Sequence, residues 1–361
     1  MKNRLITIGK NLYLNTPFME YIERELGYLG FLEQIIKLPE TSTETVTLLQ
    51  QQMQQNGNII IVTNKHAFTP VSKLLSTMID DTLILKENIL IPSKSEIYDD
   101  NSFLINYNNS TINVTMAEPG QILPMFLIEH QESIGILHIF NMDEESASLL
   151  LDPLSKTYEV KISITTLTLG WLQIECISKK YGQLGHFLKG VKQLLGNKVI
   201  ESTNIFAYII EKLAMAKKTI TFAESCTGGL IASQLTKEPG ASNVFNGSLV
   251  TYSNVLKAGW LGVEKEILEN YGAVSEQCIE QMLIGAQEIT HSDYALAVSG
   301  IAGPGGGTVQ KPVGTVYIGV RNNDQSIVEE LHFEGDRQYI QQQSMLYAYK
   351  LLLQIGSDDF F

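Results

Sequence analysis

Short apolar runs rich in Ile and Val alternate, in the first part of the chain, with stretches of helical periodicity. The runs at 5–8 and 58–63 predict buried strands, because branched side chains pack well on a pleated surface. Helices are predicted at 17–27 and 43–55. This alternation favours an α/β architecture with a largely parallel sheet. Further strands are predicted at 103–106, 111–116 and 134–140.

A smaller unit of mixed structure is predicted next. A helix is expected to begin near Asp143, and strands are expected at 157–168 and 172–178. A helix over 184–195 follows, and Gly196 is expected to end it. These elements indicate a compact α+β unit between two larger regions.

The composition of the chain changes near residue 200. Residues 1–200 contain 3 alanines and 11 glycines, whereas the shorter stretch 201–361 contains 13 and 17. Small residues let the backbone approach a ligand, so the last region is the better candidate for a site. Ser253, Ser275 and Asp336 are predicted helix caps in that region. The strands expected there are 219–223, 247–252, 294–298, 313–320 and 326–333, and the helices are 204–216, 229–236, 275–289, 337–353 and one from 254.

Charge and cysteine usage narrow the classes of function. The 361 residues include 26 basic and 39 acidic side chains, which gives a net charge of −13. Such acidity disfavours broad binding to nucleic acids or anionic membranes. No apolar run reaches 18 residues, and the first residues lack a signal-peptide pattern, so a cytoplasmic protein without a membrane partner is expected. The three cysteines and six histidines form no paired or clustered motif, so we expect no metal site and no cofactor.

The first candidate for chemistry is the segment 224–229, Glu-Ser-Cys-Thr-Gly-Gly, between a predicted strand and a predicted helix. The N-terminus of a helix presents free N–H groups that suit phosphates and developing oxyanions. Ser225 is a candidate nucleophile beside such amides, and Thr227, Gly228 and Gly229 are candidate binding residues. The alternative is a capped strand-to-helix turn without a catalytic role.

Tyr252 and Lys257 form the second candidate, near the end of one strand and in the first turn of the next helix. A partly desolvated lysine can lose its proton near neutral pH and act as a general base, and a tyrosine can relay or donate a proton. Their spacing of five does not match the Tyr-x-x-x-Lys pair of dehydrogenases. A solvated surface lysine is the alternative.

The glycine-rich segment 299–307 directly follows a predicted strand. It lacks the Gly-Lys-Ser/Thr of a Walker A motif and the last glycine of G-x-G-x-x-G. We interpret it as a substrate loop rather than a flexible turn, with Ser299, Gly300, Gly303 and the nearby Lys311 as candidate binding residues.

Arg337, at the start of the last predicted helix, is a candidate clamp for an anion, with a plain surface position as the alternative. It shares one property with the other candidates, because each lies at a strand end or a helix start. Ligand sites in open α/β sheets usually form at such positions. We therefore expect the candidates to gather in one site.

Several segments, in unbroken order over about 201–355, resemble the C-terminal domain of the CinA family (competence/damage-inducible protein). They are Ala-Glu-Ser-Cys-Thr-Gly-Gly at 223–229, Val-Thr-Tyr-Ser-Asn at 250–254 with Lys257, Gly-Ala-Val-Ser at 272–275, Ser-Gly-Ile-Ala-Gly-Pro at 299–304, Lys-Pro-Val-Gly-Thr-Val at 311–316 and Gly-Asp-Arg at 335–337. The resemblance implies a nicotinamide-nucleotide amidohydrolase, which converts nicotinamide mononucleotide to nicotinic acid mononucleotide and ammonia in pyridine-nucleotide recycling. It also implies a homodimer.

The resemblance assigns roles to these residues. Ser225 becomes the nucleophile, Lys257 with Tyr252 the proton-transfer base, and the amides after Ser225 the oxyanion hole. Arg337, Lys311 and the glycine-rich segment would hold the ribose phosphate. The alternative is a catalytically silent nucleotide-binding or scaffold protein of the same family, although an inert site would need the anion-binding residues but not the base.

For the whole chain, the resemblance implies a molybdopterin-binding-like three-layer domain at 1–145, a small KH-like α+β domain at 146–200 and a three-layer α/β domain at 201–361. In the first domain the family's Gly-Thr-Glu loop is Gly-Lys-Asn at 9–11, and its glycine-rich threonine motif appears at 63–69 without the glycines. Because those glycines and carboxylates would serve phosphate and metal binding, we expect the first domain to be a degenerate, inactive scaffold.

Overall fold

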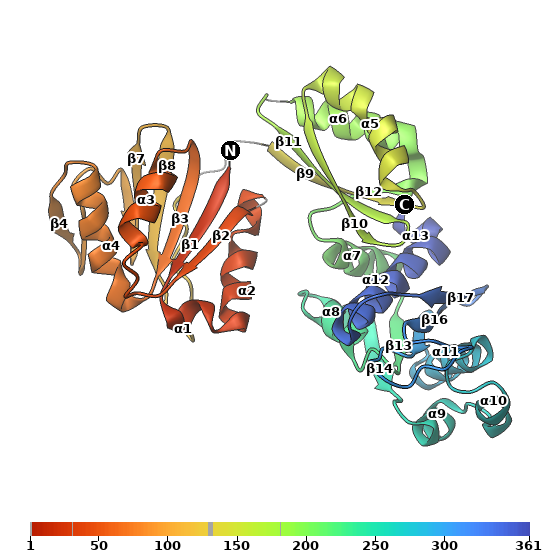
Figure 1. The fold of residues 1–361 in the computed structure, drawn as a ribbon. Helices are drawn as coiled ribbons and strands as arrows, with labels where there is room; N and C mark the ends of the chain where they lie inside the picture. The colour runs from red at the N-terminus through yellow and green to blue at the C-terminus, as the bar shows by residue number, and fades with distance from the viewer. Residues whose placement is uncertain (1, 31, 129–132, 181) are drawn as a thin grey trace. The chain divides into compact units, whose positions relative to one another are not determined.

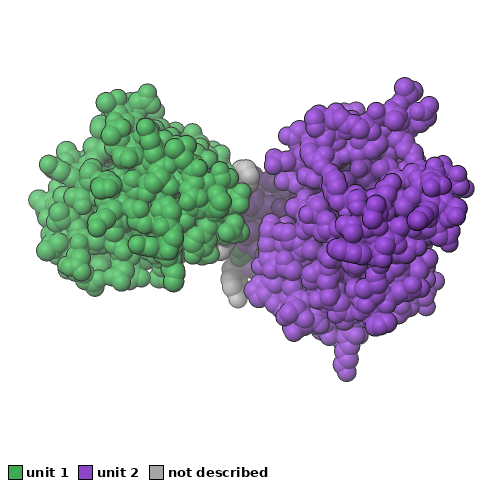
Figure 2. Space-filling view, turned by 90° about the horizontal axis from the view of Figure 1, so that it is seen from below, with its two compact units in different colours: residues 1–133 green, residues 134–361 purple. Residues whose placement is uncertain are grey.

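The computed structural model describes residues 2–30, 32–128, 133–180 and 182–361. The chain forms two compact units, residues 1–133 and 134–361 (Figure 2). The first boundary was expected after residue 145. It lies earlier, because strand β9 (Ser133–Phe140) pairs within a sheet of the second unit. In the described part of the chain, no helix has the length and apolar character needed to span a membrane.

A six-stranded sheet in the order β2-β1-β3-β8-β7-β6 forms the first unit (Figure 1). Parallel pairing joins β2 (Leu32–Leu38), β1 (Asn3–Ile8), β3 (Gly57–Thr63) and β8 (Ser110–Met116). β7 (Ser102–Tyr107) pairs antiparallel with β8, and β6 (Ile97–Asp99) pairs antiparallel with β7. The four strands predicted in this region are confirmed. The two additional strands, β2 and β6, form the two edges of the sheet. Most of their side chains are exposed, so neither is a continuous apolar run.

Helices cover both faces of this sheet. Alternation along β1 places Ile6 and Ile8 in one apolar cluster and Leu5 in another. Helices α3 and α4 contribute to the first cluster, and α1 and α2 contribute to the second. The result is the three-layer arrangement expected from the sequence. The bounds are α1 (Lys10–Tyr13), α2 (Thr16–Glu25), η1 (Gly27–Leu29), α3 (Thr45–Met53), α4 (Lys65–Met78), β4 (Leu83–Lys86) and β5 (Ile89–Pro92).

Polar side chains beyond the ends of β1 and β3 hydrogen-bond to one another. Asn64 Nδ2 donates to Asn11 Oδ1 at 2.9 Å, and Asn11 Nδ2 donates to Glu118 Oε2 at 3.0 Å. The N–H of Lys65 donates to Glu118 Oε1 at 2.7 Å. Ligands of open α/β sheets usually bind at this edge. Here the chain's own side chains use these hydrogen-bonding groups, and the inactivity of the first unit stays a prediction.

The second unit begins with a four-stranded sheet in the order β10-β11-β9-β12. Helices α5 and α6 pack against it, which is the expected α+β arrangement. The bounds are α5 (Glu144–Tyr158), β10 (Lys161–Thr168), β11 (Trp171–Ser178), α6 (Gln183–Leu195), η2 (Gly196–Lys198) and β12 (Val199–Glu201). The strand predicted from 157 begins only at Lys161, because α5 extends its apolar stripe to Tyr158.

A five-stranded sheet in the order β14-β13-β15-β16-β17 carries the rest of the unit (Figure 1). Its first three strands are parallel and its last two antiparallel. Apolar clusters lie on both faces, under α7, α8 and α12 on one and under α9 and α11 on the other. The bounds are α7 (Ile205–Ala216), β13 (Ile220–Glu224), α8 (Leu230–Thr236), η3 (Ala241–Asn243), β14 (Phe245–Val250), α9 (Asn254–Leu261), α10 (Lys265–Asn270), α11 (Glu276–Thr290), β15 (Tyr294–Gly300), β16 (Thr315–Arg321), β17 (Ser326–His332), α12 (Arg337–Ile355) and α13 (Ser357–Phe360).

The three predicted caps are confirmed. The side chains of Ser253, Ser275 and Asp336 accept hydrogen bonds from backbone N–H groups in the first turns of α9, α11 and α12. A capped start fixes where each helix begins. It therefore also fixes the positions of Lys257 in α9 and Arg337 at the start of α12.

Helix α12 is buried along most of its length. It packs on the five-stranded sheet, and Phe140 and Trp171 of the four-stranded sheet belong to the same apolar cluster. Gln343 Nε2 also donates to the carbonyl oxygen of Leu167 in β10 at 3.0 Å. Both sheets of the second unit therefore share this helix.

Candidate active site

The candidate active site lies at the carboxyl ends of β13, β14 and β15. Glu224, the last residue of β13, pairs in register with residues near the ends of both neighbouring strands. The residues that end or follow these strands therefore meet: Ser225 follows β13, Tyr252 follows β14, and Ser299 is the second-last residue of β15. The N–H of Ser225 donates to the carbonyl oxygen of Val298 at 2.9 Å, which fixes the serine backbone against β15.

Ser225 and Lys257 are in direct contact. Lys257 Nζ donates to Ser225 Oγ at 2.9 Å and to the carbonyl oxygen of Thr251 at 2.6 Å. The lysine residue is fully buried and the serine is 8% exposed. The Thr251 carbonyl oxygen fixes one hydrogen of the amine, and in its neutral form the amine can accept the serine hydroxyl proton through its lone pair across the same 2.9 Å contact. The geometry is that of a nucleophile beside a base.

Burial also changes the pKa of Lys257. Desolvation lowers its pKa below the ordinary lysine value, because the charged form loses hydration. The thiols of Cys226 and Cys278 lie nearby, and burial raises their pKa values to about 12 and about 11. Both thiols are therefore neutral at physiological pH and provide no thiolate to stabilise the ammonium. This environment favours a neutral amine more than a surface would.

A pocket of about 270 Å³ opens beside this pair. Its wall brings together most of the residues singled out from the sequence. The lining residues are Ser225, Cys226, Tyr252, Lys257, Ala273, Val274, Ser299, Gly300, Ile301, Ala302, Gly303, Gly305, Gly306 and Arg337. At Gly303, φ is +83° and an added Cβ would lie 2.6 Å from Val313 Cγ1, so a larger residue would distort the wall.

Arg337 closes one side of the pocket. Its Nη1 donates to the carbonyl oxygen of Gly303 at 2.6 Å, and its Nη2 donates to the Tyr252 hydroxyl at 2.8 Å. The remaining guanidinium donors are available to an anion. In the described residues, the Tyr252 hydroxyl contacts this arginine rather than Ser225 or Lys257. The structure therefore pairs the tyrosine with Arg337 and not with Lys257.

Glu224 occupies the N-terminus of α8. Its carboxylate accepts hydrogen bonds from the N–H groups of Gly229, Ile231 and Ala232 at 2.9, 3.1 and 3.0 Å. Ser248 Oγ donates to it as well, at 3.0 Å, and the residue is fully buried. A carboxylate is thus already bound where a helix would otherwise attract a substrate anion. The free helix terminus expected from the sequence does not exist.

Four predicted binding residues lie outside the pocket wall: Thr227, Gly228, Gly229 and Lys311. The N–H of Gly228 donates to the Ser225 carbonyl oxygen, and that of Gly229 donates to Glu224. Lys311 Nζ donates to the carbonyl oxygens of Tyr271 and Val274 at 2.9 and 2.5 Å. This lysine ties the glycine-rich segment to the 271–274 loop, and both of these segments line the pocket.

Two functional features have only weak sequence signals. Glu224 precedes Ser225 at the end of a buried strand. A charged residue in such a strand was the one sequence signal that it has a specific hydrogen-bonding role. The Thr251 carbonyl oxygen that holds Lys257 is a backbone atom, so no residue type marks it. Among the described residues, no group of three or more His, Cys, Asp or Glu side chains is arranged to hold a metal ion.

Comparison with known proteins places this site in a family. A family model for the CinA C-terminal domain matches residues 202–355. A CinA-like protein of Pseudothermotoga lettingae is 30% identical over 309 residues, which cover 82% of this chain and 74% of the relative. The chain belongs to the CinA family. Its family-matching segment contains every residue of the candidate active site.

Other CinA-family proteins match over shorter lengths. A CinA-like protein of Thermosipho melanesiensis is 38% identical over 210 residues, which are 57% of this chain and 52% of that relative. The chain thus spans about half the length of this curated CinA relative. A crystal structure of the competence/damage inducible protein CihA from Agrobacterium tumefaciens is 38% identical and covers 42% of this chain and 93% of that one, with a TM-score of 0.41.

Proposed function

We propose that this chain is an amidohydrolase that converts nicotinamide mononucleotide to nicotinic acid mononucleotide and ammonia. The proposal includes the homodimer and the cytoplasmic location expected from the sequence. The observation that carries it is the 2.9 Å contact between the fully buried Lys257 Nζ and Ser225 Oγ, inside a pocket that also presents Arg337. A site that only binds a nucleotide would not require a buried lysine in contact with a serine.

In this mechanism, neutral Lys257 accepts the proton of the attacking hydroxyl. The new C–O bond forms at the carboxamide carbon, and the carbonyl oxygen becomes an oxyanion. Lys257 then returns the proton to the amide nitrogen, the C–N bond breaks, and ammonia leaves. This account of the proton is the same whether Ser225 Oγ itself attacks or orients a water molecule. In the first case, a water repeats the sequence on the acyl-enzyme.

The oxyanion needs donors close to Ser225. Of the amides that follow the serine, those of Gly228 and Gly229 are already bonded within the protein. Within the described residues, the N–H group of Cys226, which lines the pocket, donates to no protein acceptor, so we assign the oxyanion to it. Arg337 has donors left for the substrate phosphate, and Lys311 acts indirectly by holding the loop.

Ammonia release from nicotinamide mononucleotide, measured with a chelator present, tests the proposal. We expect turnover by the full chain, and a loss of at least about 100-fold for Ser225→Ala and for Lys257→Met. Ser233→Ala on the exposed side of α8 serves as the matched serine control and should keep full activity. Near-normal release by Ser225→Ala would contradict the mechanism. Tight nucleotide binding without any release would instead identify a silent binding protein.

A further inference from the structure

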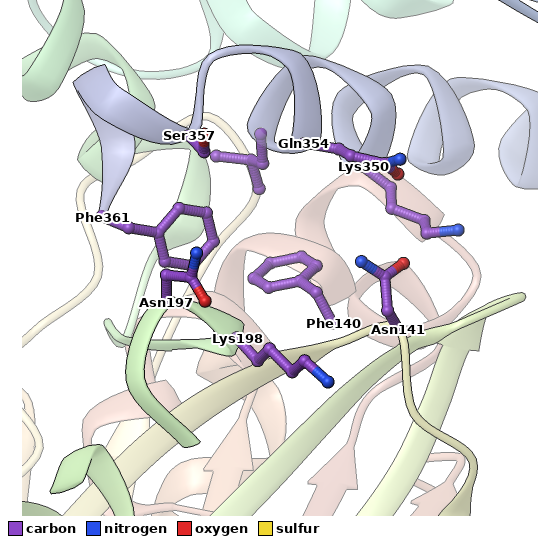
Figure 3. A pocket seen from close by; sticks show the side chains of 9 residues that line it. Phe140, Asn141, Asn197, Lys198, Lys350, Gln354, Ser357 and Phe361 are labelled. Atoms are coloured by element: carbon purple, nitrogen blue, oxygen red, sulfur yellow. The ribbon is translucent and has the colours of Figure 1, made fainter.

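A second pocket, of about 250 Å³, lies within the second unit and shares no lining residue with the pocket around Ser225. Its wall comes from the end of β9, from η2 and from the last turns of α12 with the segment that follows. Figure 3 shows the Phe140 ring between Lys350 and Asn141 on one side and Phe361 and Asn197 on the other. The proposed amidohydrolase activity makes no use of this pocket.

The wall of this pocket is basic. It contains Lys198 and Lys350, with the side-chain amides of Asn141 and Asn197 beside them, and no Asp or Glu. The chain as a whole carries a net charge of −13, so a wall without acidic residues stands out from the average surface. Within the described residues, Lys198 makes no ion pair and is exposed. The wall therefore offers several donors and two positive charges to an anion.

Lys350 is the most informative residue of this wall, because it is a buried lysine. It is only 6% exposed, and its Nζ donates to the Tyr347 hydroxyl at 3.2 Å and lies 4.3 Å from the centre of that ring. The Tyr347 hydroxyl in turn donates to Glu329 Oε2 at 2.6 Å, so this carboxylate reaches the lysine only through the tyrosine. Burial lowers the pKa of Lys350, as expected for an ammonium without a direct carboxylate partner. A bound anion would provide the partner that this ammonium lacks.

The rest of the wall is apolar and partly aromatic. Phe140 and Phe361 meet edge to face, with ring centres 5.9 Å apart, and Leu353 completes the apolar part. Rings of this kind stack well on flat ligand groups. A volume of about 250 Å³ suits a small molecule rather than a peptide. The two lysines of the wall match the charge of about −2 on a phosphate monoester better than the single charge of a carboxylate.

We propose that this pocket binds a small phosphate monoester attached to a planar ring, in the size range of a nucleoside monophosphate. The phosphate lies between Lys350 and Lys198, and the ring lies against Phe140 and Phe361. This site is separate from the site of amide hydrolysis, and its existence does not depend on that activity.

Isothermal titration of the full chain with adenosine monophosphate tests this proposal, and inorganic phosphate and benzoate serve as partial probes. Because both pockets can attract a phosphate, the titrations use an Arg337→Ala background as well as the unmodified chain. We expect binding in both, weakened at least about 5-fold by Lys198→Gln and unchanged by Lys265→Gln, an exposed lysine of α10. Lys350→Gln should also weaken binding, and circular dichroism checks its fold.

Three results would overturn the proposal. Absence of binding to the Arg337→Ala chain would remove the second site. Binding that is insensitive to Lys198→Gln, with Lys350→Gln folded and equally tight, would place the ligand elsewhere. Tighter binding of benzoate than of adenosine monophosphate would reject a phosphate monoester as the ligand class.

Discussion

Arg337 and Tyr252 are 85 positions apart in the sequence, and a 2.8 Å hydrogen bond from the guanidinium Nη2 to the phenolic oxygen joins them at the pocket mouth. The tyrosine is 60% exposed and lies against this arginine, while the buried lysine contacts the serine instead. Two groups of residues thus share the pocket: the lysine–serine pair and the arginine–tyrosine pair, to which the proposed function gives proton transfer and substrate binding.

This separation predicts the effect of Tyr252→Phe. The variant loses one hydrogen bond to Arg337 but keeps the ring, so KM for nicotinamide mononucleotide should rise about 5- to 10-fold while kcat stays within about 2-fold. Steady-state kinetics measure the split. A kcat that falls about 100-fold at unchanged KM would mean that the tyrosine relays a proton. Tyr339→Phe, which removes an exposed hydroxyl near the start of α12, is the control.

The lowered pKa of Lys257 predicts a pH dependence of activity. The base must be neutral, so kcat/KM should rise with pH through the folded-state pKa of this lysine and level off below the ordinary lysine value. Stability should follow the same direction. Between the lowered folded pKa and the unfolded pKa, the unfolded chain binds more protons, so the free energy of unfolding rises with pH. Lys257→Met should lose the contribution of this lysine to the pH dependence of stability, and denaturation at several pH values checks this.

Glu224 is predicted to be a major contributor to local stability. In Glu224→Gln a neutral amide replaces the carboxylate that accepts three backbone N–H groups and the Ser248 hydroxyl. We expect the free energy of unfolding to fall by about 2–3 kcal/mol, since hydrogen bonds to charged groups are the stronger ones. Urea denaturation measures the change. Glu266→Gln on the exposed surface of α10 should change little, and equal effects of the two variants would contradict this role.

Lys311 offers a test that distinguishes a tie between loops from a phosphate ligand. As a tie, Lys311→Gln should lower kcat/KM about equally for nicotinamide mononucleotide and for the corresponding nucleoside without phosphate. As a phosphate ligand, it should affect only the nucleotide. Arg337→Gln provides the comparison, because we expect its effect to be at least about 10-fold larger for the nucleotide than for the nucleoside.

Much of the fold follows from patterns that the sequence carries. Buried strands such as β3 and β15 are continuous apolar runs, and Ser253, Ser275 and Asp336 mark the starts of helices. The edge strand β2 has no such pattern because most of its side chains are exposed. Helix α12 has buried residues on every side, so its residues do not separate into an apolar and a polar face.

The site was predictable as a set of residues but not as a set of contacts. Strand ends at one sheet edge explain why Ser225, Tyr252 and Ser299 meet. Arg337 and Lys311 reach their four partners across loops, and three of those partners are backbone carbonyl oxygens. From the sequence, the N-terminus of α8 was expected to be free to bind an anion. Only the position of the Glu224 carboxylate relative to three backbone amides shows that it occupies this site.

The position of α12 between two sheets has a consequence for anyone who shortens this protein. A fragment that starts at residue 201 would leave the side of the helix that faces Phe140 and Trp171 in water, and Gln343 would lose its acceptor. Such a fragment would expose an apolar surface and be prone to aggregation, although it contains every residue that lines the pocket around Ser225. The small four-stranded sheet thus shields the apolar side of α12, the helix that begins at Arg337, from water.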